Sequence, residues 1–253
     1  MALIHAHVFS NVLQKHVQMN VILPNTGKPP YPVFYLLHGL SDDFSTWQRR
    51  TSIERYVENL PLIVVMPDGF RGFYTDHHEG PAYGRYMIED VIGFIEKSFP
   101  VQKTRASRCV GGLSMGGYGA LRLALAHPDL FVSASSHSGA CHAGHNDPRM
   151  QKDPEFRRIF GPKSKGSVND IHALAEKLKL SRAKLPELHI DCGTEDFLIQ
   201  HNRDFIAHLK RLGVPHHYAE FPGTHSWDYW DLHIREALEF HCAALKIEAA
   251  PDK

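Results

Sequence analysis

Two short apolar runs constrain the fold of this chain more than any other feature. Residues 33–37 (VFYLL) and 62–66 (LIVVM) are apolar at every position, without the alternation of a strand that faces water on one side. Such runs are typical of a parallel sheet covered on both faces, because each side chain then enters one core or the other. They predict a mostly parallel central sheet with helices on both faces.

Periodicity and turn residues extend this pattern along the chain. Strands are expected at residues 4–9, 17–23, 33–37, 62–66, 107–113, 131–136, 188–192 and 216–221, and helices at 52–60, 87–99, 115–126, 199–212 and 227–245. The first two strands should form an antiparallel hairpin. Alternation of the remaining strands with helices predicts an α/β fold.

The length of the chain fits one domain. A single core over residues 1–253 would bury roughly three quarters of the surface that the unfolded chain exposes. Residues 140–185 break the alternation, since they are rich in Gly, Pro, Lys and His around one helical patch at 171–180. We interpret this interval as a cap-like insertion over the upper edge of the sheet, within a single domain.

The charge balance excludes partners that are recognised by bulk charge. Lys and Arg total 28 and Asp and Glu total 28, so the formal net charge is zero. Nucleic acids and anionic membranes attract chains with an excess of basic residues. We therefore expect neither as a partner. The expected partner is a small molecule, and a homo-oligomer is left open.

Cysteine placement and the first residues bear on the cellular location. The four cysteines, at 109, 141, 192 and 242, are scattered and form no CxxC pair, so we expect free thiols. The N-terminal segment lacks the basic start and apolar run of a secretory signal. No stretch approaches the 18 apolar residues that cross a bilayer. The expected location is the cytoplasm.

The motif Gly112-x-Ser114-x-Gly116 lies between a predicted strand and a predicted helix. A serine in a sharp strand-to-helix turn needs small residues two positions to either side, because the two backbones come close there. This is the nucleophile elbow of serine hydrolases. The alternative is a glycine-rich packing turn, and the strand before and helix after the motif favour the elbow.

A serine hydroxyl needs a base and a group that orients the base. In this architecture the order along the chain is serine, acid, histidine, with acid and histidine after later strands. Asp196 follows the strand at 188–192 and is the candidate acid, with Glu195 as the second choice. Asp191 lies inside that strand. A helix-capping role for Asp196 is the alternative.

His225 is the candidate base, because it follows the last predicted strand and precedes the last predicted helix. The chain has 19 histidines, and the others do not combine these features. A surface histidine near a helix start is the alternative interpretation. For several others we expect solvent-exposed positions on helix or strand faces: His201, His208, His216, His217 and His241.

The negative oxygen that forms during acyl transfer needs preorganised backbone N–H donors. One donor is expected from the residue after the nucleophile, Met115, and the other from the loop after an earlier central strand. His38-Gly39-Leu40 ends such a strand, and Gly39 allows a close turn, so Leu40 is the expected second donor. We expect a structural role for His38.

Five segments carry a resemblance to a known family. They are 36–40 (LLHGL), 67–69 (PDG), 112–120 (GLSMGGYGA), 192–196 (CGTED) and 223–227 (GTHSW). Over nearly the whole chain, this set resembles the putative esterase family. That family includes tributyrin esterases, esterase D (S-formylglutathione hydrolase), feruloyl esterase modules and mycolyltransferases. The segment 74–76 (YTD) is most similar to the small tributyrin-type carboxylesterases.

The resemblance implies an α/β-hydrolase fold that acts on short acyl esters. It implies Ser114, Asp196 and His225 as catalytic triad, with Leu40 and Met115 as oxyanion donors. S-formylglutathione hydrolases are expected to have longer chains and a Cys-containing segment after the first oxyanion strand, whereas residues 40–44 read LSDDF. Glutathione thioesters are therefore not the expected substrates. Cell-wall and polysaccharide esters are also disfavoured, because no secretion signal precedes the domain.

Aromatic residues near strand ends are candidates for the substrate pocket. Tyr74 and Trp227, with Phe73, could line an acyl or alcohol pocket, and packing is the equal alternative. The spacing His142-x-x-His145-x-Asp147 could suit a metal. Its irregular loop and lack of a second ligand pair favour a solvated histidine-rich loop. We therefore expect neither a metal nor a cofactor.

The sequence thus predicts a serine carboxylesterase for short-chain acyl esters that works through an acyl-enzyme. An acyltransferase, or an esterase for S-formylglutathione, feruloyl or acetyl-sugar substrates, would use the same triad. A non-catalytic interaction protein on a hydrolase scaffold is disfavoured, because all three triad positions are present. A serine peptidase is disfavoured, because the chain shows no gating domain and amides need more activation than esters.

Overall fold

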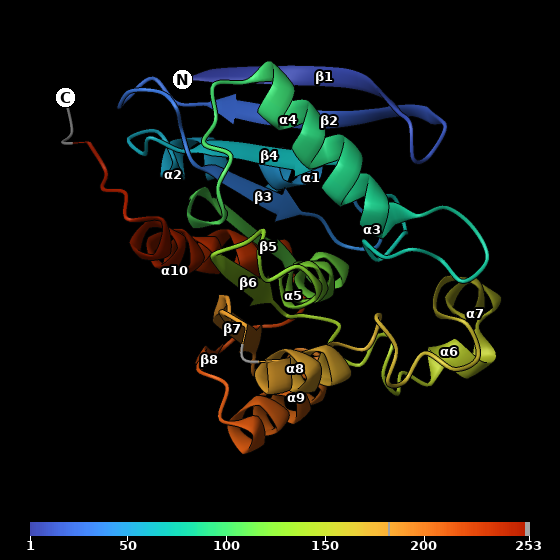
Figure 1. The fold of residues 1–253 in the computed structure, drawn as a ribbon. Helices are drawn as coiled ribbons and strands as arrows, with labels where there is room; N and C mark the ends of the chain where they lie inside the picture. The colour runs from blue at the N-terminus through green and yellow to red at the C-terminus, as the bar shows by residue number, and fades with distance from the viewer. Residues whose placement is uncertain (182, 251–253) are drawn as a thin grey trace.

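The structure is a computed structural model that describes residues 1–181 and 183–250. Its centre is an eight-stranded sheet in the order β1-β2-β4-β3-β5-β6-β7-β8 (Figure 1). The strands are β1 (Ala2–Ser10), β2 (Lys15–Leu23), β3 (Val33–Leu37), β4 (Ile63–Pro67), β5 (Arg108–Leu113), β6 (Ser133–His137), β7 (Glu187–Gly193) and β8 (His217–Phe221). The β1–β2 and β2–β4 pairs are antiparallel, and the other pairs between these strands are parallel. The predicted hairpin and mostly parallel sheet are confirmed.

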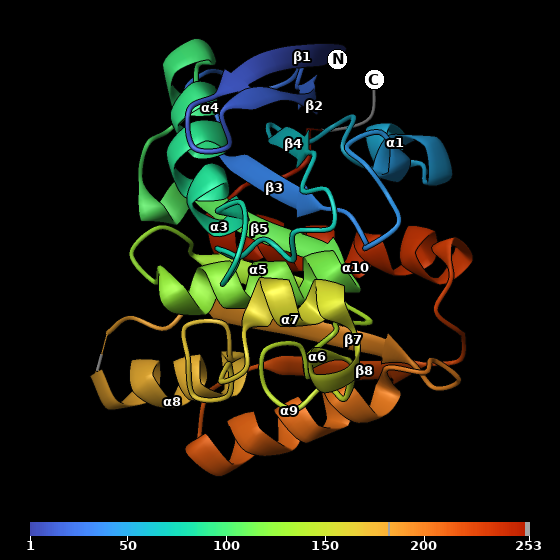
Figure 2. The same cartoon turned by 90° about the vertical axis from the view of Figure 1, so that its right-hand side faces the viewer.

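Helices cover both faces of the sheet (Figures 1 and 2). They are α1 (Thr46–Arg50), α2 (Ile53–Tyr56), α3 (Tyr83–Arg85), the π-helical segment η1 (Tyr86–Val91), α4 (Ile92–Ser98), the 3-10 turn η2 (Arg105–Ser107), α5 (Met115–Ala126), α6 (Arg149–Lys152), α7 (Pro154–Phe160), α8 (Ile171–Ser181), α9 (Ile199–Leu212) and α10 (Trp227–Leu245). One core joins the sheet to α4, α5, α8 and α9, and the other joins it to α1, α2 and α10.

The strand β3 shows how the apolar runs divide between these cores. Val33, Tyr35 and Leu37 are buried in the core under α5. Phe34 and Leu36 are buried in the core under α10. Successive strand side chains point to opposite faces, so a strand covered on both sides must be apolar throughout.

The chain between β6 and β7 departs from the prediction of a cap over the sheet edge. It contains α6 and α7, and also α8, which packs beside α5 on the face of the sheet. The buried positions Ile171, Leu174, Ala175 and Leu178 form one side of α8. This amphipathic pattern makes α8 part of the helical layer that covers the sheet. Only α6 and α7 are then left for a cap.

The crossover between β3 and β4 is also more divided than predicted. A helix was expected at 52–60, whereas α1 begins at Thr46 and α2 ends at Tyr56. The side chain of Trp47 is buried and donates from Nε1 to the backbone oxygen of Leu37 at 2.9 Å. This contact fixes α1 against the end of β3, so the crossover begins earlier than the apolar spacing suggested.

Two of the histidines that were expected to be exposed are buried. His241 on α10 lies between two strand hydroxyls, with Nδ1 at 2.8 Å from Ser133 Oγ and Nε2 at 2.9 Å from Ser135 Oγ. His208 on α9 is buried beside the backbone oxygen of His172, at 3.0 Å from Nε2. Buried imidazoles are tolerated where both ring nitrogens find partners. The expectation of solvent exposure is wrong for both.

Two expectations concern the whole chain. All four cysteines are free thiols, as predicted, and Cys109, Cys141 and Cys192 are buried. Among residues 1–181 and 183–250, no helix combines the length and hydrophobicity that crossing a bilayer requires.

Candidate active site

Ser114 occupies the turn between β5 and α5, as the motif predicts. Its backbone has φ 53° and ψ −113°, which is rare for a residue with a side chain. Such strain persists only where the surrounding structure fixes it, and it concentrates at functional sites. The turn presents the hydroxyl of Ser114 to a cavity at the carboxyl end of the sheet.

The two motif glycines are required by close backbone approach. A Cβ at Gly112 would lie 2.6 Å from the backbone oxygen of Leu37. A Cβ at Gly116 would lie 2.4 Å from the same oxygen and 2.7 Å from that of His38. The start of α5 therefore sits directly against the end of β3, and only glycine fits on either side of Ser114.

Substitution Gly116→Ala is expected to destabilise the protein by about 1–3 kcal/mol, because the new methyl group meets backbone atoms that cannot move aside. Chemical denaturation of the purified variant measures the change. Gly93→Ala in α4 is the matched control, since its added Cβ would meet no atom within 4 Å in the described chain apart from its chain neighbours and its own helix backbone. In a helix that change should be neutral or stabilising by about 0.5–1 kcal/mol. Equal stability of Gly116→Ala and the parent would contradict the close approach.

The structure brings the three predicted triad residues together. His225 Nε2 lies 3.0 Å from Ser114 Oγ, and His225 Nδ1 lies 2.8 Å from Asp196 Oδ2. Ser114 and His225 are 111 positions apart in the sequence, and Asp196 and His225 are 29 positions apart. Ser114 ends β5, Asp196 follows β7 and His225 follows β8, so the parallel strands deliver all three to the same edge of the sheet.

Asp196 is placed to remain a carboxylate. It is 2% exposed, and its Oδ1 accepts from the backbone N–H of Leu198 at 2.7 Å. Burial raises the pKa of Asp196, but the hydrogen bonds from His225 and Leu198 outweigh burial, so the net pKa is lowered. A charged acceptor at Nδ1 fixes which ring nitrogen of His225 carries the proton, and leaves Nε2 free to accept from Ser114.

The competing carboxylates are engaged elsewhere. Glu195, the second choice for the acid, is exposed, and its Oε2 accepts from the backbone N–H of Gly223 at 2.6 Å. Asp191 is fully buried inside β7, where its carboxylate accepts from the Tyr229 hydroxyl at 2.9 Å and lies 2.7 Å from His137 Nδ1. The carboxylate that pairs with His225 Nδ1 is that of Asp196.

The predicted oxyanion donors both line the cavity of Ser114. Met115 is the first residue of α5, where backbone N–H groups lack helical partners. Before Leu40, the N–H of Gly39 is already used, since it donates to Asp42 Oδ2 at 3.1 Å. Burial raises the pKa of Asp42. This bond occupies the N–H of Gly39, so within this turn the predicted donor stays Leu40, which lines the cavity.

The buried side chain of His38 connects this turn to the loop after β4. It is 1% exposed, and its Nε2 accepts from the backbone N–H of Gly69 at 2.9 Å. Its Nδ1 lies 2.7 Å from the backbone oxygen of Gly39. The imidazole thus joins the loops that follow β3 and β4, which agrees with the expected structural role.

The cavity over Ser114 has a volume of about 450 Å³. Trp227 lines it, as predicted. Tyr74 does not: its side chain is fully buried, and its hydroxyl donates to the backbone oxygen of His38 at 3.1 Å. The prediction for Tyr74 is therefore corrected to a packing role behind the oxyanion turn. Its neighbour Phe73, which was named with it, does line the cavity.

Several cavity residues were not found by sequence reasoning. Arg50, Arg149 and Phe197 all line the cavity. The ring of Phe197 lies 4.5 Å from that of His225, although Phe197 is 71% exposed. Its position directly after Asp196 was an available signal. Arg149 belongs to α6 between β6 and β7, where nothing in the local pattern indicated a contact with the site.

The histidine-rich segment does not assemble the ligand set that its spacing suggested. His142 Nε2 lies 2.9 Å from Asp204 Oδ2, whereas Asp147 is bound by Arg149. His145 instead joins Asp170 and His172 in a group whose candidate ligand atoms lie within 4.8 Å of one another. Asp170 also accepts backbone N–H groups at the start of α8. The group lines a different cavity from that of Ser114.

Comparison with known proteins gives matches over nearly the whole chain. The model of the family described as "Putative esterase" matches residues 10–241. An acetyl esterase of Caldicellulosiruptor saccharolyticus is 33% identical, over 95% of this chain and 98% of the relative. The solved structure of the fluorophosphonate-binding serine hydrolase F of Staphylococcus aureus is 34% identical, with a TM-score of 0.86 over 95% of this chain and 98% of the other.

A third relative bears on the chain-length argument. The S-formylglutathione hydrolase FrmB of Staphylococcus aureus is 34% identical in its solved structure, with a TM-score of 0.85. The match covers 95% of this chain and 98% of that one, so the two have similar lengths. A longer chain is therefore not a general mark of proteins with that name, and chain length does not separate them from this protein.

Proposed function

The chain belongs to the putative esterase family and has the α/β-hydrolase fold, and from this premise we propose that Ser114, His225 and Asp196 hydrolyse short-chain acyl esters. A carboxylic ester hydrolase activity agrees with relatives named acetyl esterase and serine hydrolase. One observation carries the assignment of residues: His225 lies within hydrogen-bond distance of both Ser114 and Asp196, at 3.0 and 2.8 Å.

In the first half-reaction Ser114 Oγ attacks the ester carbonyl while His225 Nε2 takes the hydroxyl proton. The carbonyl oxygen becomes negative and accepts hydrogen bonds from the N–H groups of Leu40 and Met115. Asp196 stabilises the positive charge that forms on the imidazole. The tetrahedral intermediate then collapses, the C–O bond to the alcohol breaks, and His225 gives its proton to the departing oxygen.

Water completes the cycle. It loses a proton to His225 and attacks the acyl group on Ser114, which forms a second tetrahedral intermediate at the same oxyanion donors. Collapse of this intermediate releases the carboxylic acid, and the proton returns to Ser114 Oγ. The enzyme residues end in their starting protonation states, so no cofactor is consumed.

The dimensions of the cavity support a small acyl group. Its volume of about 450 Å³ must hold both the acyl and alcohol parts, and Phe73, Trp227 and Trp230 are among its walls. Rates on p-nitrophenyl esters from acetate to laurate are expected to peak at about two to four acyl carbons, because each further methylene must fit among fixed aromatic walls. The measurement is kcat/KM along the series.

Aryl acetates, sugar acetates and a feruloyl ester belong in the same panel, since they separate the alcohol preference from the acyl preference. A rate that rises steadily to laurate would contradict the short-chain proposal and indicate an open, lipase-like cleft. Activity confined to the feruloyl ester would also contradict it.

A further inference from the structure

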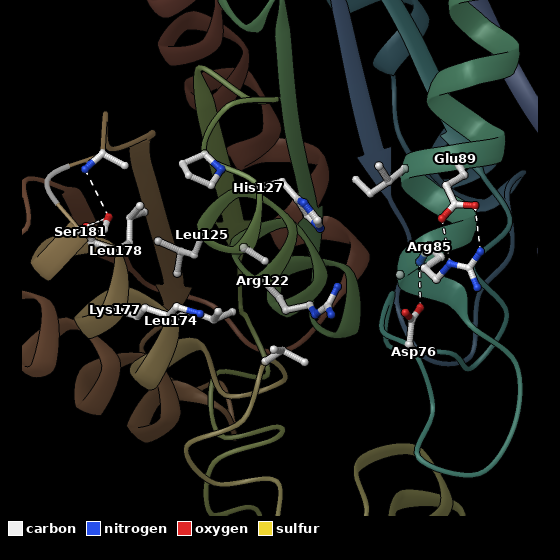
Figure 3. Close-up of a pocket in the computed structure, with 16 residues that line it drawn as sticks. Asp76, Arg85, Glu89, Arg122, Leu125, His127, Leu174, Lys177, Leu178 and Ser181 are labelled. Carbon is white, nitrogen blue, oxygen red and sulfur yellow. Dashed lines mark hydrogen bonds and ion pairs between the residues drawn. The ribbon is translucent and has the colours of Figure 1, made fainter.

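A second cavity, of about 440 Å³, lies between α5, α8 and the segment from α3 to η1 (Figure 3). In the described chain, its lining shares no residue with the cavity of Ser114. Arg122 lies at this cavity on α5, eight positions after Ser114, and takes no part in the proposed mechanism. The cavity therefore contains a charged side chain whose partner has to be identified.

Arg122 is a buried guanidinium with too few partners. It is 6% exposed. Among the residues that the structure describes, its hydrogen bond runs from Nη1 to the backbone oxygen of Tyr74, at a long 3.5 Å. Its Nε is buried without a partner. A guanidinium carries five donors and stays protonated in proteins, and a buried charge is costly unless it is paired and hydrogen-bonded.

The carboxylates nearby do not satisfy it. Asp76 faces Arg122 across Gly84, but its Oδ1 accepts from the backbone N–H of Arg85 at 2.8 Å. No carboxylate of the described residues lies within ion-pair distance of Arg122, and Glu89 pairs with Arg85 at 2.8 Å. Burial lowers the pKa of Arg122, although Tyr118 and Asp76 oppose this shift.

The cavity has a charged side and an apolar side. In Figure 3 the guanidinium of Arg122 extends toward Asp76, Arg85 and Glu89, while Leu125, Leu174 and Leu178 gather on the other side. Lys177 is an exposed cation among the lining residues. A molecule placed here would meet a donor fork at one end and branched aliphatic side chains at the other.

We propose that this cavity is a binding site for a small carboxylate with a short apolar tail. The two oxygens of the carboxylate would accept parallel hydrogen bonds from the Arg122 guanidinium, in the bidentate geometry that arginine favours. The tail would lie against the leucines of α5 and α8. Inorganic phosphate shares the anionic chemistry but lacks the tail, so the comparison of the two ligands tests both halves of the site.

Calorimetric titration of the full-length Ser114→Ala protein with sodium butanoate tests the proposal, since this variant removes turnover and leaves the second cavity intact. One butanoate per chain is expected at this cavity. Arg122→Met should weaken binding at least tenfold. Butanoate should also bind at least tenfold more tightly than phosphate at equal ionic strength.

Val168→Trp provides a second test that does not disturb the core. Val168 lines the cavity and is 60% exposed, so the larger ring should block the entrance and weaken binding as strongly as Arg122→Met. Leu180→Trp is the matched control, because Leu180 is 82% exposed and lies outside the lining. It should bind like the parent.

Absence of butanoate binding would overturn the proposal, as would unchanged binding in Val168→Trp. If Val168→Trp bound butanoate as the parent does, the ligand would lie outside this cavity. One such place is the cavity of Ser114, because butanoate is the acid that hydrolysis of a butyrate ester releases. Phosphate binding as tight as butanoate would overturn the role of the apolar side. None of these outcomes depends on esterase activity, which is measured separately through Ser114.

Discussion

Replacement Ser114→Ala is expected to lower kcat on p-nitrophenyl acetate and butyrate by at least about 10³-fold, because the acyl-enzyme can no longer form. The residual rate should come from the oxyanion donors and from substrate binding. Alanine keeps a Cβ at the same strained backbone position, where φ is 53°. The thermal midpoint should therefore stay close to that of the parent.

Steady-state kinetics and thermal unfolding of the same preparations separate loss of chemistry from loss of fold. Gly93→Ala serves as an exposed variant carried through the same purification, with activity expected at the parental level. Turnover by Ser114→Ala at the parental rate would show that another group attacks the ester. The proposed nucleophile would then be wrong.

Replacement Asp196→Asn should lower kcat by about 10⁴-fold while the geometry of the site is kept. An asparagine amide can donate to His225 Nδ1, which would place the imidazole proton on Nε2 and prevent that atom from accepting from Ser114. Because the pKa of Asp196 is lowered, its carboxylate is already charged at any pH above the ordinary aspartate pKa. Protonation of Asp196 should therefore cause no change in the rate between pH 6 and 9, a window that lies roughly two or more units above the reference aspartate pKa.

Glu195→Gln is the matched control, since it removes the neighbouring charge while an amide oxygen can still accept from Gly223. A loss of roughly threefold or less is expected, as for a surface substitution. The measurement is kcat for both variants across that pH range. A large loss in Glu195→Gln with little loss in Asp196→Asn would reverse the assignment of the acid and contradict the 2.8 Å contact.

Much of the fold could be predicted because the strongest signals are local. The strand at 33–37 and the helices at 115–126, 199–212 and 227–245 have the predicted bounds. Each combines a clear apolar period with a turn or breaker at its ends. The early start of α1 could not be predicted, because it depends on the bond from Trp47 to Leu37, which the apolar spacing of 52–60 does not contain.

The triad positions were predictable for a related reason. The elbow motif locates one residue, and parallel strands then limit the other two to the loops that follow later strands. The substrate pocket was less accessible to this argument. Tyr74 lies near a strand end, but its ring packs against Gly69 and Gly119, where an added Cβ would lie 2.3 and 2.4 Å from it. The contact with Gly119 joins segments 45 positions apart, so the local pattern around Tyr74 does not reveal it.

Buried polar residues were the least predictable. His241 is buried because Ser133 and Ser135, more than 100 positions earlier, provide its partners. Arg122 lies within a helix whose other residues are largely apolar, and sequence periodicity alone gave no reason to expect a cavity beside it. Long-range packing decides whether such a residue faces solvent, a partner or a cavity.

Labelling with a fluorophosphonate, followed by mass spectrometry of the peptides, tests the central claim most directly. The reagent forms a covalent bond with a serine only where a base activates its hydroxyl. One adduct per chain is predicted, on the peptide that contains Ser114, with no adduct on Ser114→Ala and a greatly slowed reaction in Asp196→Asn. An unlabelled native protein, or an adduct on a different residue, would contradict the account.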